Sequence, residues 1–141
     1  MATHRITFRV YYEDTDAGGI VYHARYLAFA ERARTEAIRS VDAAVTDLAR
    51  EYEQHFVVRK ADIRYMSPLR LDDLMEIETA LVDLTPTRIK LSQSFRNVSR
   101  NNESSAIVNV ELACLGISTM KPERIPTSWC ERIRKLEAGE V

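Results

Sequence analysis

Apolar and polar side chains alternate at the start of the chain and then change to a helical spacing. Over residues 4–11 every second side chain is apolar, which predicts a strand with one buried face. From about residue 22 to about residue 41, apolar side chains recur every three to four positions between charged ones. This spacing predicts one long amphipathic helix, and a shorter helical segment is expected over about residues 44–52.

Beyond His55 the spacing returns to period two and keeps it for most of the remaining chain. Turns that contain proline or several asparagines separate the apolar runs. The expected elements are strands over residues 56–66, 74–84, 89–96 and 106–118, followed by a terminal helix over residues 128–138 with Ser128 as its N-cap.

The order of these elements indicates the fold class. Consecutive strands joined by short turns favour an antiparallel sheet of about five strands, and the long helix must bury its apolar stripe against that sheet. The sequence shows no internal repeat and no linker. We therefore predict an α+β fold in which residues 1–141 form a single domain.

Charge and cysteine content narrow the class of protein. The 20 basic and 21 acidic residues give a net charge of −1, which offers no electrostatic footprint for nucleic acid. No apolar run approaches the roughly 18 residues needed to span a bilayer, and the first residues lack the apolar core of a signal peptide. The two isolated cysteines, Cys114 and Cys130, are typical of a reducing compartment. We predict a soluble, cytoplasmic protein that does not span a membrane.

The segment from Tyr12 to Tyr26 concentrates the residues that could perform chemistry. It joins the end of a predicted strand, three acidic residues, two adjacent glycines and the start of the long helix, which carries a histidine. Unpaired N–H groups at a helix start can polarise a carbonyl group. A nearby carboxylate can attack that carbonyl or activate a water molecule.

Three other interpretations compete for this segment. Asp14 or Asp16 could simply cap the helix, and this alternative stays open because aspartate is common at that position. A calcium loop would need a side-chain ligand where Gly18 stands and a glutamate where Arg25 stands. A metal site built from the two aspartates and His23 lacks a second histidine at suitable spacing.

The same segment carries a resemblance to a known family. Its pattern, Tyr-x-Asp-Thr-Asp-x-x-Gly-x-Val-Tyr-His-x-x-Tyr, resembles the signature of the 4-hydroxybenzoyl-CoA thioesterase-like branch of the hotdog superfamily. Within that branch the chain is similar to the acyl-CoA thioesterases associated with the Tol-Pal envelope system. The similarity continues through residues 31–36, 55–59, 65–73 and 124–126, so it spans nearly the whole chain. It implies a hotdog fold, in which a curved sheet wraps the long helix.

The resemblance also implies roles for individual residues. Asp16 corresponds to the catalytic carboxylate of the family, and His23 and Tyr12 correspond to residues that surround it. The backbone N–H groups near Gly19 to Tyr22 are candidates to polarise the thioester carbonyl. We expect the substrate to contact the motif residues Gly19, Ile20, Val21, Tyr22 and Tyr26, and the CoA phosphates to contact basic residues near strand ends, namely Arg64, Arg88 and Lys90.

The implied reaction is hydrolysis of an acyl-CoA thioester, in which the CoA thioester is the substrate and no cofactor is needed. Asp16 either attacks the thioester carbonyl, which gives a mixed anhydride, or deprotonates a water molecule, and both routes stay open. The family forms homodimers, with acyl-CoA at the dimer interface, and often homotetramers. Acyl carrier protein is an alternative carrier of the acyl group.

The alternative function is a non-catalytic adaptor that binds acyl-CoA or acyl carrier protein, because the fold alone would permit it. A hotdog dehydratase is disfavoured, since the long helix lacks a matching pair of histidine and acid. Among the other acids, Asp14 is expected to cap or position the loop. Glu31 is expected to form a surface ion pair with Arg34, three residues further along the helix. His4 and His55 are expected to be structural.

Overall fold

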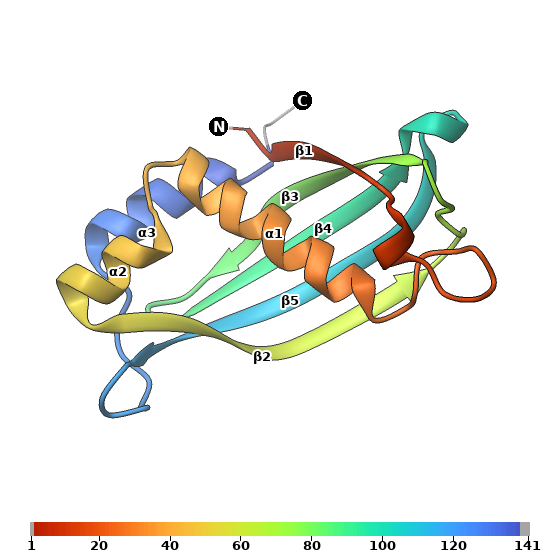
Figure 1. Cartoon of the computed structure of the whole chain (residues 1–141). Coiled ribbons are helices and arrows are strands. Elements are labelled where there is room, and N and C mark those ends of the chain that lie inside the picture. The colour runs from red at the N-terminus through yellow and green to blue at the C-terminus, as the bar shows by residue number, and fades with distance from the viewer. Residues whose placement is uncertain (1, 139–141) are drawn as a thin grey trace.

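The computed structural model describes residues 2–138, so Met1 and residues 139–141, which the single-domain prediction also covers, lie outside the described part. These described residues form one five-stranded sheet and three α-helices (Figure 1). The elements are β1 (His4–Arg9), a 3-10 turn (Tyr12–Asp14), α1 (Arg25–Ser40), α2 (Val45–Tyr52), β2 (Gln54–Tyr65), β3 (Leu74–Leu84), β4 (Arg88–Asn97), a 3-10 turn (Val98–Arg100), β5 (Glu103–Gly116), α3 (Thr127–Ile133) and a 3-10 turn (Arg134–Leu136).

The strands pair in the order β1-β3-β4-β5-β2, and every pairing is antiparallel. The sheet is curved, and α1 lies across its concave face, with β1 and β2 at the two edges (Figure 1). This confirms the predicted α+β fold, with a long helix held inside an antiparallel sheet. The bounds of β3 agree with the predicted strand at both ends, because its side chains alternate cleanly between the buried and outer faces.

The stripe of α1 that faces the sheet is narrow and rich in alanine, because Ala30, Ala33 and Ala37 are all completely buried. Small side chains let the helix axis approach the strands closely. Larger side chains nearer the helix ends, Tyr26 and Ile38 among them, are also buried, one in each apolar cluster of the core. Burial of this stripe, more than helix propensity, stabilises α1.

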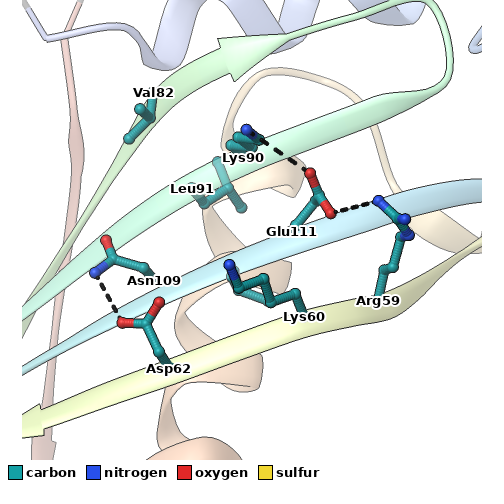
Figure 2. A pocket seen from close by; sticks show the side chains of 9 residues that line it. Arg59, Lys60, Asp62, Val82, Lys90, Leu91, Asn109 and Glu111 are labelled. Atoms are coloured by element: carbon teal, nitrogen blue, oxygen red, sulfur yellow. Dashed lines mark hydrogen bonds and ion pairs between the residues drawn. The ribbon is translucent and has the colours of Figure 1, made fainter.

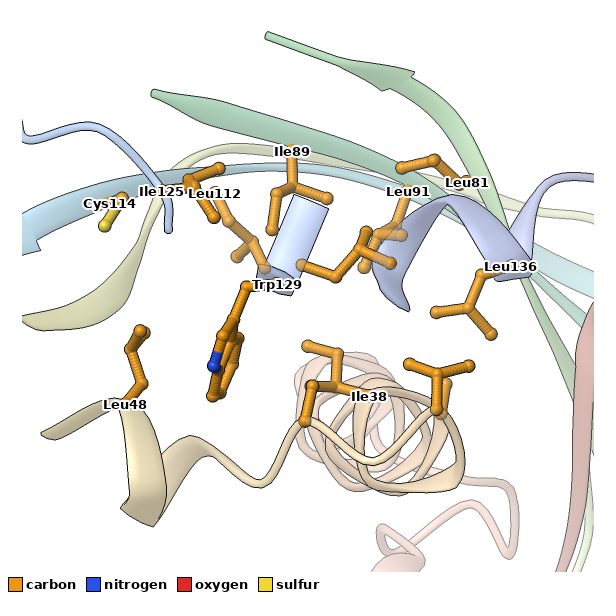
Figure 3. Close-up of a cluster of buried hydrophobic side chains, with 14 of the residues drawn as sticks. Ile38, Leu48, Leu81, Ile89, Leu91, Leu112, Cys114, Ile125, Trp129 and Leu136 are labelled. Atoms are coloured by element: carbon orange, nitrogen blue, oxygen red, sulfur yellow. The ribbon is translucent and has the colours of Figure 1, made fainter. Parts of the chain in front are cut away.

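Two apolar clusters fill the space between α1 and the sheet. The Trp129 cluster lies where α2 and α3 meet the sheet (Figure 3). The Phe95 cluster lies towards the first turns of α1. The Trp129 cluster contains Ala37, Ile38, Val41, Ala43, Leu48, Leu81, Ile89, Leu91, Val110, Leu112, Cys114, Ile125, Trp129, Ile133 and Leu136. The Phe95 cluster contains Val10, Val21, Tyr26, Phe29, Ala30, Ala33, Leu69, Met75, Ile77, Phe95, Ala106 and Val108.

A buried amide stands between the two clusters. Gln93 lies on β4 between Leu91 of one cluster and Phe95 of the other, and its side chain is completely buried. Its Nε2 donates to the carbonyl of Ala30 on α1 at 2.8 Å and to the hydroxyl of Thr79 on β3 at 3.1 Å. Because a buried polar group must find partners, these bonds favour one position of α1 over the sheet.

Several predicted boundaries were wrong. The strand expected over residues 106–118 spans Glu103–Gly116, and the terminal helix ends at Ile133 instead of residue 138. The starts of two helices also differ. The long helix begins at Arg25 instead of about residue 22, because Val21 N–H donates to the carbonyl of Leu69 and Tyr22 N–H to that of Asp14, which requires extended backbone. The terminal helix begins at Thr127, and its N-cap is Pro126 instead of Ser128. Proline fixes φ and lacks an N–H, so the helix starts directly after it. Within residues 2–138, no helix has the length and apolarity to cross a membrane.

Candidate active site

The segment that carries Asp16 is a small, tightly closed loop. Thr15 and Val21 form an antiparallel bridge, and the N–H of Asp16 donates to the carbonyl of Ile20 at 2.9 Å. At the tip, the N–H of Gly19 donates to the carbonyl of Asp16 at 3.0 Å, and Gly19 has φ +78°, a conformation that glycine adopts without strain. The two neighbouring glycines of the motif therefore close this loop.

The Asp16 carboxylate is exposed and held by one hydrogen bond. Its Oδ1 accepts the N–H of Gly18 at 2.8 Å, and a Cβ at residue 18 would stand only 3.2 Å from that oxygen. Within residues 2–138 it forms no ion pair. Oδ2 is left free to meet a ligand.

Asp14, two residues earlier, is buried and fully engaged. Its Oδ1 accepts from the guanidinium of Arg25, at 2.5 Å from Nη2 and 3.1 Å from Nε. Its Oδ2 accepts the N–H of Tyr11 at 2.9 Å. The carboxylate therefore ties the loop to the first residue of α1, as expected for a positioning residue.

Neither aspartate caps the helix, so that interpretation was wrong. The N-cap of α1 is Ala24, which makes no side-chain cap. The carboxylate of Asp14 instead takes the Arg25 side chain and that of Asp16 takes the loop amide of Gly18. Within residues 2–138, no three histidine, cysteine or acidic side chains gather closely enough to hold a metal ion.

A pocket of about 370 Å³ opens beside Asp16, between the loop, the start of α1 and the end of β2. It brings together five of the predicted site residues: Asp16, Ile20, Val21, His23 and Tyr26. The complete lining is Asp16, Ile20, Val21, His23, Tyr26, Tyr65, Met66, Ser67 and Pro68. Most of these walls are apolar, so a carboxylate and an imidazole stand at the edge of a surface suited to an acyl group.

His23 lies in the turn before α1, and its ring packs on that of Tyr22 with centroids 4.5 Å apart. Tyr26 is buried deeper and packs against Phe95 at 5.4 Å. Burial raises the pKa of the Tyr26 hydroxyl, and a backbone hydrogen bond at Leu69 offsets part of that rise. Tyr26 is therefore a neutral wall of the pocket.

The predicted amide donors are mostly engaged already. Within the chain, the N–H of Gly19 donates to Asp16, that of Val21 to Leu69 and that of Tyr22 to Asp14. Ile20 is the one residue of this group whose N–H has no partner among the described residues. The chemistry proposed for these amides therefore narrows to a single donor.

Other predicted residues lie away from the pocket. Tyr12 is 82% exposed in the 3-10 turn and does not line it. Arg64 immediately precedes Tyr65 on β2. Its register partner, Ile107 on β5, places it on the outer face of the sheet. The sequence alone did not separate these positions, because exposure and face depend on the strand register.

Arg88 and Lys90 lie at the start of β4, whereas the pocket lies near the end of that strand. Figure 2 shows Lys90 in a cavity of about 680 Å³, where Glu111 accepts from Arg59 at 3.0 Å and lies 3.8 Å from the Lys90 ammonium. Lys90 and Glu111 are register partners, and neighbouring Val110 belongs to the core, so this cavity lies on the outer face of the sheet. Within one chain these two basic residues do not reach Asp16.

Glu31, which the sequence analysis also considered, lines a separate cavity. Glu31 borders a space of about 350 Å³ between α1, α2 and β2, together with Arg34 and His55. The predicted Glu31–Arg34 ion pair is absent from residues 2–138. Burial lowers the pKa of Arg34, and the charge of Glu31 partly opposes this.

Neither cysteine has the environment of a nucleophile. Burial raises the pKa of the Cys114 thiol to about 11, and the charge of Glu123 adds to the rise. Burial also raises the pKa of Cys130.

The four residues of the pocket that the sequence did not assign are Tyr65, Met66, Ser67 and Pro68. These residues belong to the segment 65–73, whose Tyr-x-x-Pro pattern contributed to the family resemblance but did not indicate a function for any of them.

Comparison with known proteins gives a consistent result. Residues 10–133 match the family model of the thioesterase-like superfamily. The acyl-CoA thioester hydrolase YbgC of Escherichia coli O157:H7 is 43% identical over 122 residues, which cover 85% of this chain and 87% of that protein. The acyl-CoA thioesterase YbgC of Haemophilus influenzae is 42% identical over 118 residues, which cover 84% of this chain and 85% of that protein.

Solved structures agree with these relatives. The "probable thioesterase" of Bartonella henselae superposes with a TM-score of 0.82 at 36% identity, over 89% of this chain and all of that one. A 1,4-dihydroxy-2-naphthoyl-CoA thioesterase of Synechocystis superposes with a TM-score of 0.87 at 18% identity, over 96% and 98%. At that identity the likeness shows the fold alone.

Proposed function

The chain belongs to the thioesterase-like superfamily, and from this premise we propose that it hydrolyses an acyl-CoA thioester to a free acid and CoA. We assign the first step to Asp16. One observation carries the assignment: Asp16 is an exposed carboxylate with a free oxygen, on the wall of an apolar pocket that also contains His23. Asp14, the competing acid, is buried and paired.

The proposed reaction begins at the thioester carbonyl. In one route Oδ2 of Asp16 forms a bond to the carbonyl carbon, the carbon–sulfur bond breaks, and CoA leaves as a thiolate. Water then hydrolyses the acyl–aspartyl anhydride and restores the carboxylate. In the other route the carboxylate takes a proton from water, and the hydroxide oxygen attacks the same carbon. Both routes give one acid and one CoA.

The surrounding groups suit either route. His23 shares the pocket with Asp16, so it can donate a proton to the leaving thiolate or orient the attacking water. Among the amides of Gly19 to Tyr22, the N–H of Ile20 has no partner within residues 2–138, so it can polarise the carbonyl. Tyr12, which the resemblance places around Asp16, is exposed in the 3-10 turn and does not line the pocket, so we assign it no step. The acyl group packs on Val21, Tyr26 and the rest of the apolar lining.

The proposal extends to the assembly and location. We propose a homodimer, and a homotetramer built from two of them, in the cytoplasm, with acyl carrier protein as an alternative carrier. β2 supports a pairing of sheets, because it is a twelve-residue edge strand on which Val58 and Tyr65 are about half exposed. Light scattering after gel filtration measures the assembly, and a monomer at micromolar concentration would contradict this part.

The test of the activity is thiol release from a panel of short, long and aromatic acyl-CoAs. Turnover of one class supports the proposal. Binding of an acyl-CoA without thiol release would favour the adaptor function. A single turnover in ¹⁸O-labelled water can then reveal direct attack. If water opens the anhydride at the Asp16 carbonyl, the label enters Asp16 and the first acid released contains none. Label in the first acid instead fits a general base, or water attack at the acyl carbonyl of the anhydride.

A further inference from the structure

Tyr65 joins the edge of the sheet to the turn that carries His23. It is the last residue of β2, and its ring lines the pocket. Its hydroxyl donates to the backbone carbonyl of His23 at 2.7 Å, across 42 residues of sequence. No role follows for this residue from the sequence pattern.

The turn has few other restraints at this point. His23 and Ala24 are exposed, and Ala24 makes no side-chain cap. The backbone bond from Arg25 N–H to the carbonyl of Tyr22 closes the turn, and the His23 ring packs on the neighbouring Tyr22 ring. Among the described residues, Tyr65 is the one side chain that bonds to the backbone of His23. Without that bond, the carbonyl of His23 would be free to rotate with the turn.

Tyr65 itself is well anchored. Its ring meets that of Tyr26 edge to face, with centroids 5.1 Å apart, and Tyr26 packs on Phe95 in the core. Its backbone pairs with Ala106 on β5, and the next amide, Met66 N–H, donates to the carbonyl of Ser105 at 2.9 Å. A hydroxyl on such a support can hold the turn in one conformation.

We infer that Tyr65 is a positioning residue for the reaction proposed above. Its hydroxyl fixes the backbone at His23, and this fixes the direction of the imidazole towards the thioester held against Asp16. It acts through His23 and not on the reacting atoms. The inference rests on the proposed function, because a fixed imidazole matters to turnover only if this pocket hydrolyses thioesters.

Tyr65→Phe isolates the hydroxyl, because the ring and its contact with Tyr26 remain. We expect kcat to fall about three- to tenfold, the change that corresponds to one neutral hydrogen bond, with KM within about twofold. Tyr52→Phe is the matched control, since Tyr52 lies on α2 and its hydroxyl forms no hydrogen bond within residues 2–138. That control should match the wild type. An unchanged kcat in Tyr65→Phe, or a change in KM alone, overturns the inference.

The same substitution made in a His23→Ala variant distinguishes a positioning role of Tyr65 from a loss of stability. If the hydroxyl acts through His23, then His23→Ala with Tyr65→Phe should be no slower than His23→Ala alone, within about twofold. An equal loss in both backgrounds overturns the inference.

The imidazole proton resonances of the free protein distinguish a failure of this inference from a failure of the proposed thioesterase function. At fixed pH, Tyr65→Phe should shift the imidazole proton resonances of His23 and leave those of His4 and His55 unchanged. If the wild type releases no thiol, the proposed function fails, while this shift still supports the structural part of the inference. If none of the three histidines responds, Tyr65 does not position His23 at all.

Discussion

The two ends of the sheet differ in how they are closed. At the end where β2 begins, α2 and α3 cover the strands, and Trp129 is only 2% exposed (Figures 1 and 3). At the end where β2 finishes, a loop covers the strands, and Ile20 and Tyr65 remain partly exposed around a pocket. Helices bury apolar surface completely, whereas a loop stabilised by its own hydrogen bonds leaves room for a ligand. One end therefore stabilises the fold, and we propose that the other carries the chemistry.

Within the loop end, the carboxylates also differ in how deeply they are buried and how many hydrogen-bond partners they have. Asp14 and Asp73 are both buried and each has several hydrogen-bond partners. Asp16 is exposed with one partner. Two acids therefore hold the loops in place, while the third is exposed and is the one to which we assign the reaction. The following predictions test this division.

Trp129→Ala should have the largest effect on stability, because it removes the largest side chain of the closed end. We expect a loss of about 3–5 kcal/mol in the free energy of unfolding, measured by urea titration. The folded fraction should keep its turnover, since Trp129 does not line the pocket. A stable variant with low activity would break the proposed separation of the two ends.

Asp14→Ala should cost less stability but should also affect the loop that carries Asp16. It leaves the Arg25 guanidinium and the Tyr11 N–H without their partner, for a loss of about 2 kcal/mol, because Arg25 is partly exposed. Turnover should fall with it. The control is Glu36→Ala, which breaks the exposed pair with Arg39 and should cost less than about 0.5 kcal/mol. Equal effects from both variants would contradict the role of Asp14.

The environment of Asp73 predicts that the free energy of unfolding depends on pH. Burial opposes the charge of its carboxylate, but hydrogen bonds from Arg70 N–H and Asn97 and the charge of Arg100 outweigh it, so its pKa is lowered. A lowered pKa in the folded state gives stability that is present at neutral pH and lost as pH falls below about 5. Asp73→Asn should therefore cost about 1 kcal/mol at pH 7 and less at pH 3. A difference that stays constant with pH would contradict this.

The cysteines should show the smallest effect. Because burial raises the pKa of Cys114 to about 11, iodoacetamide should modify it at pH 8 far more slowly in the folded protein than in urea. Cys130, which is less buried, should react sooner. Modification of Cys130 should leave turnover unchanged, since it lies at the closed end. Loss of activity in step with that modification would show that the ends are not independent.

Much of the fold could be predicted, because period-two spacing marks strands such as β3 directly. The start of α1 could not, because residues 21–22 are held extended by Leu69 and Asp14, and no local spacing reports such bonds. The motif singled out Asp16 and His23, which both line one pocket, and their roles stay predictions. Lys90 was predicted from its charge and its place near a strand end, but the register of β4 puts it at the other end of the sheet, on the outer face.

The most direct test removes one exposed carboxylate charge at each end of the sheet and measures CoA release. Asp16 lines the pocket, and Asp83 lies near the opposite end, on β3. Since both are exposed, Asp16→Asn and Asp83→Asn should unfold within about 2 °C of the wild type. We predict that kcat/KM falls at least about a hundredfold in Asp16→Asn and is unchanged in Asp83→Asn. Equal rates in all three proteins would contradict the assignment of the chemistry to Asp16.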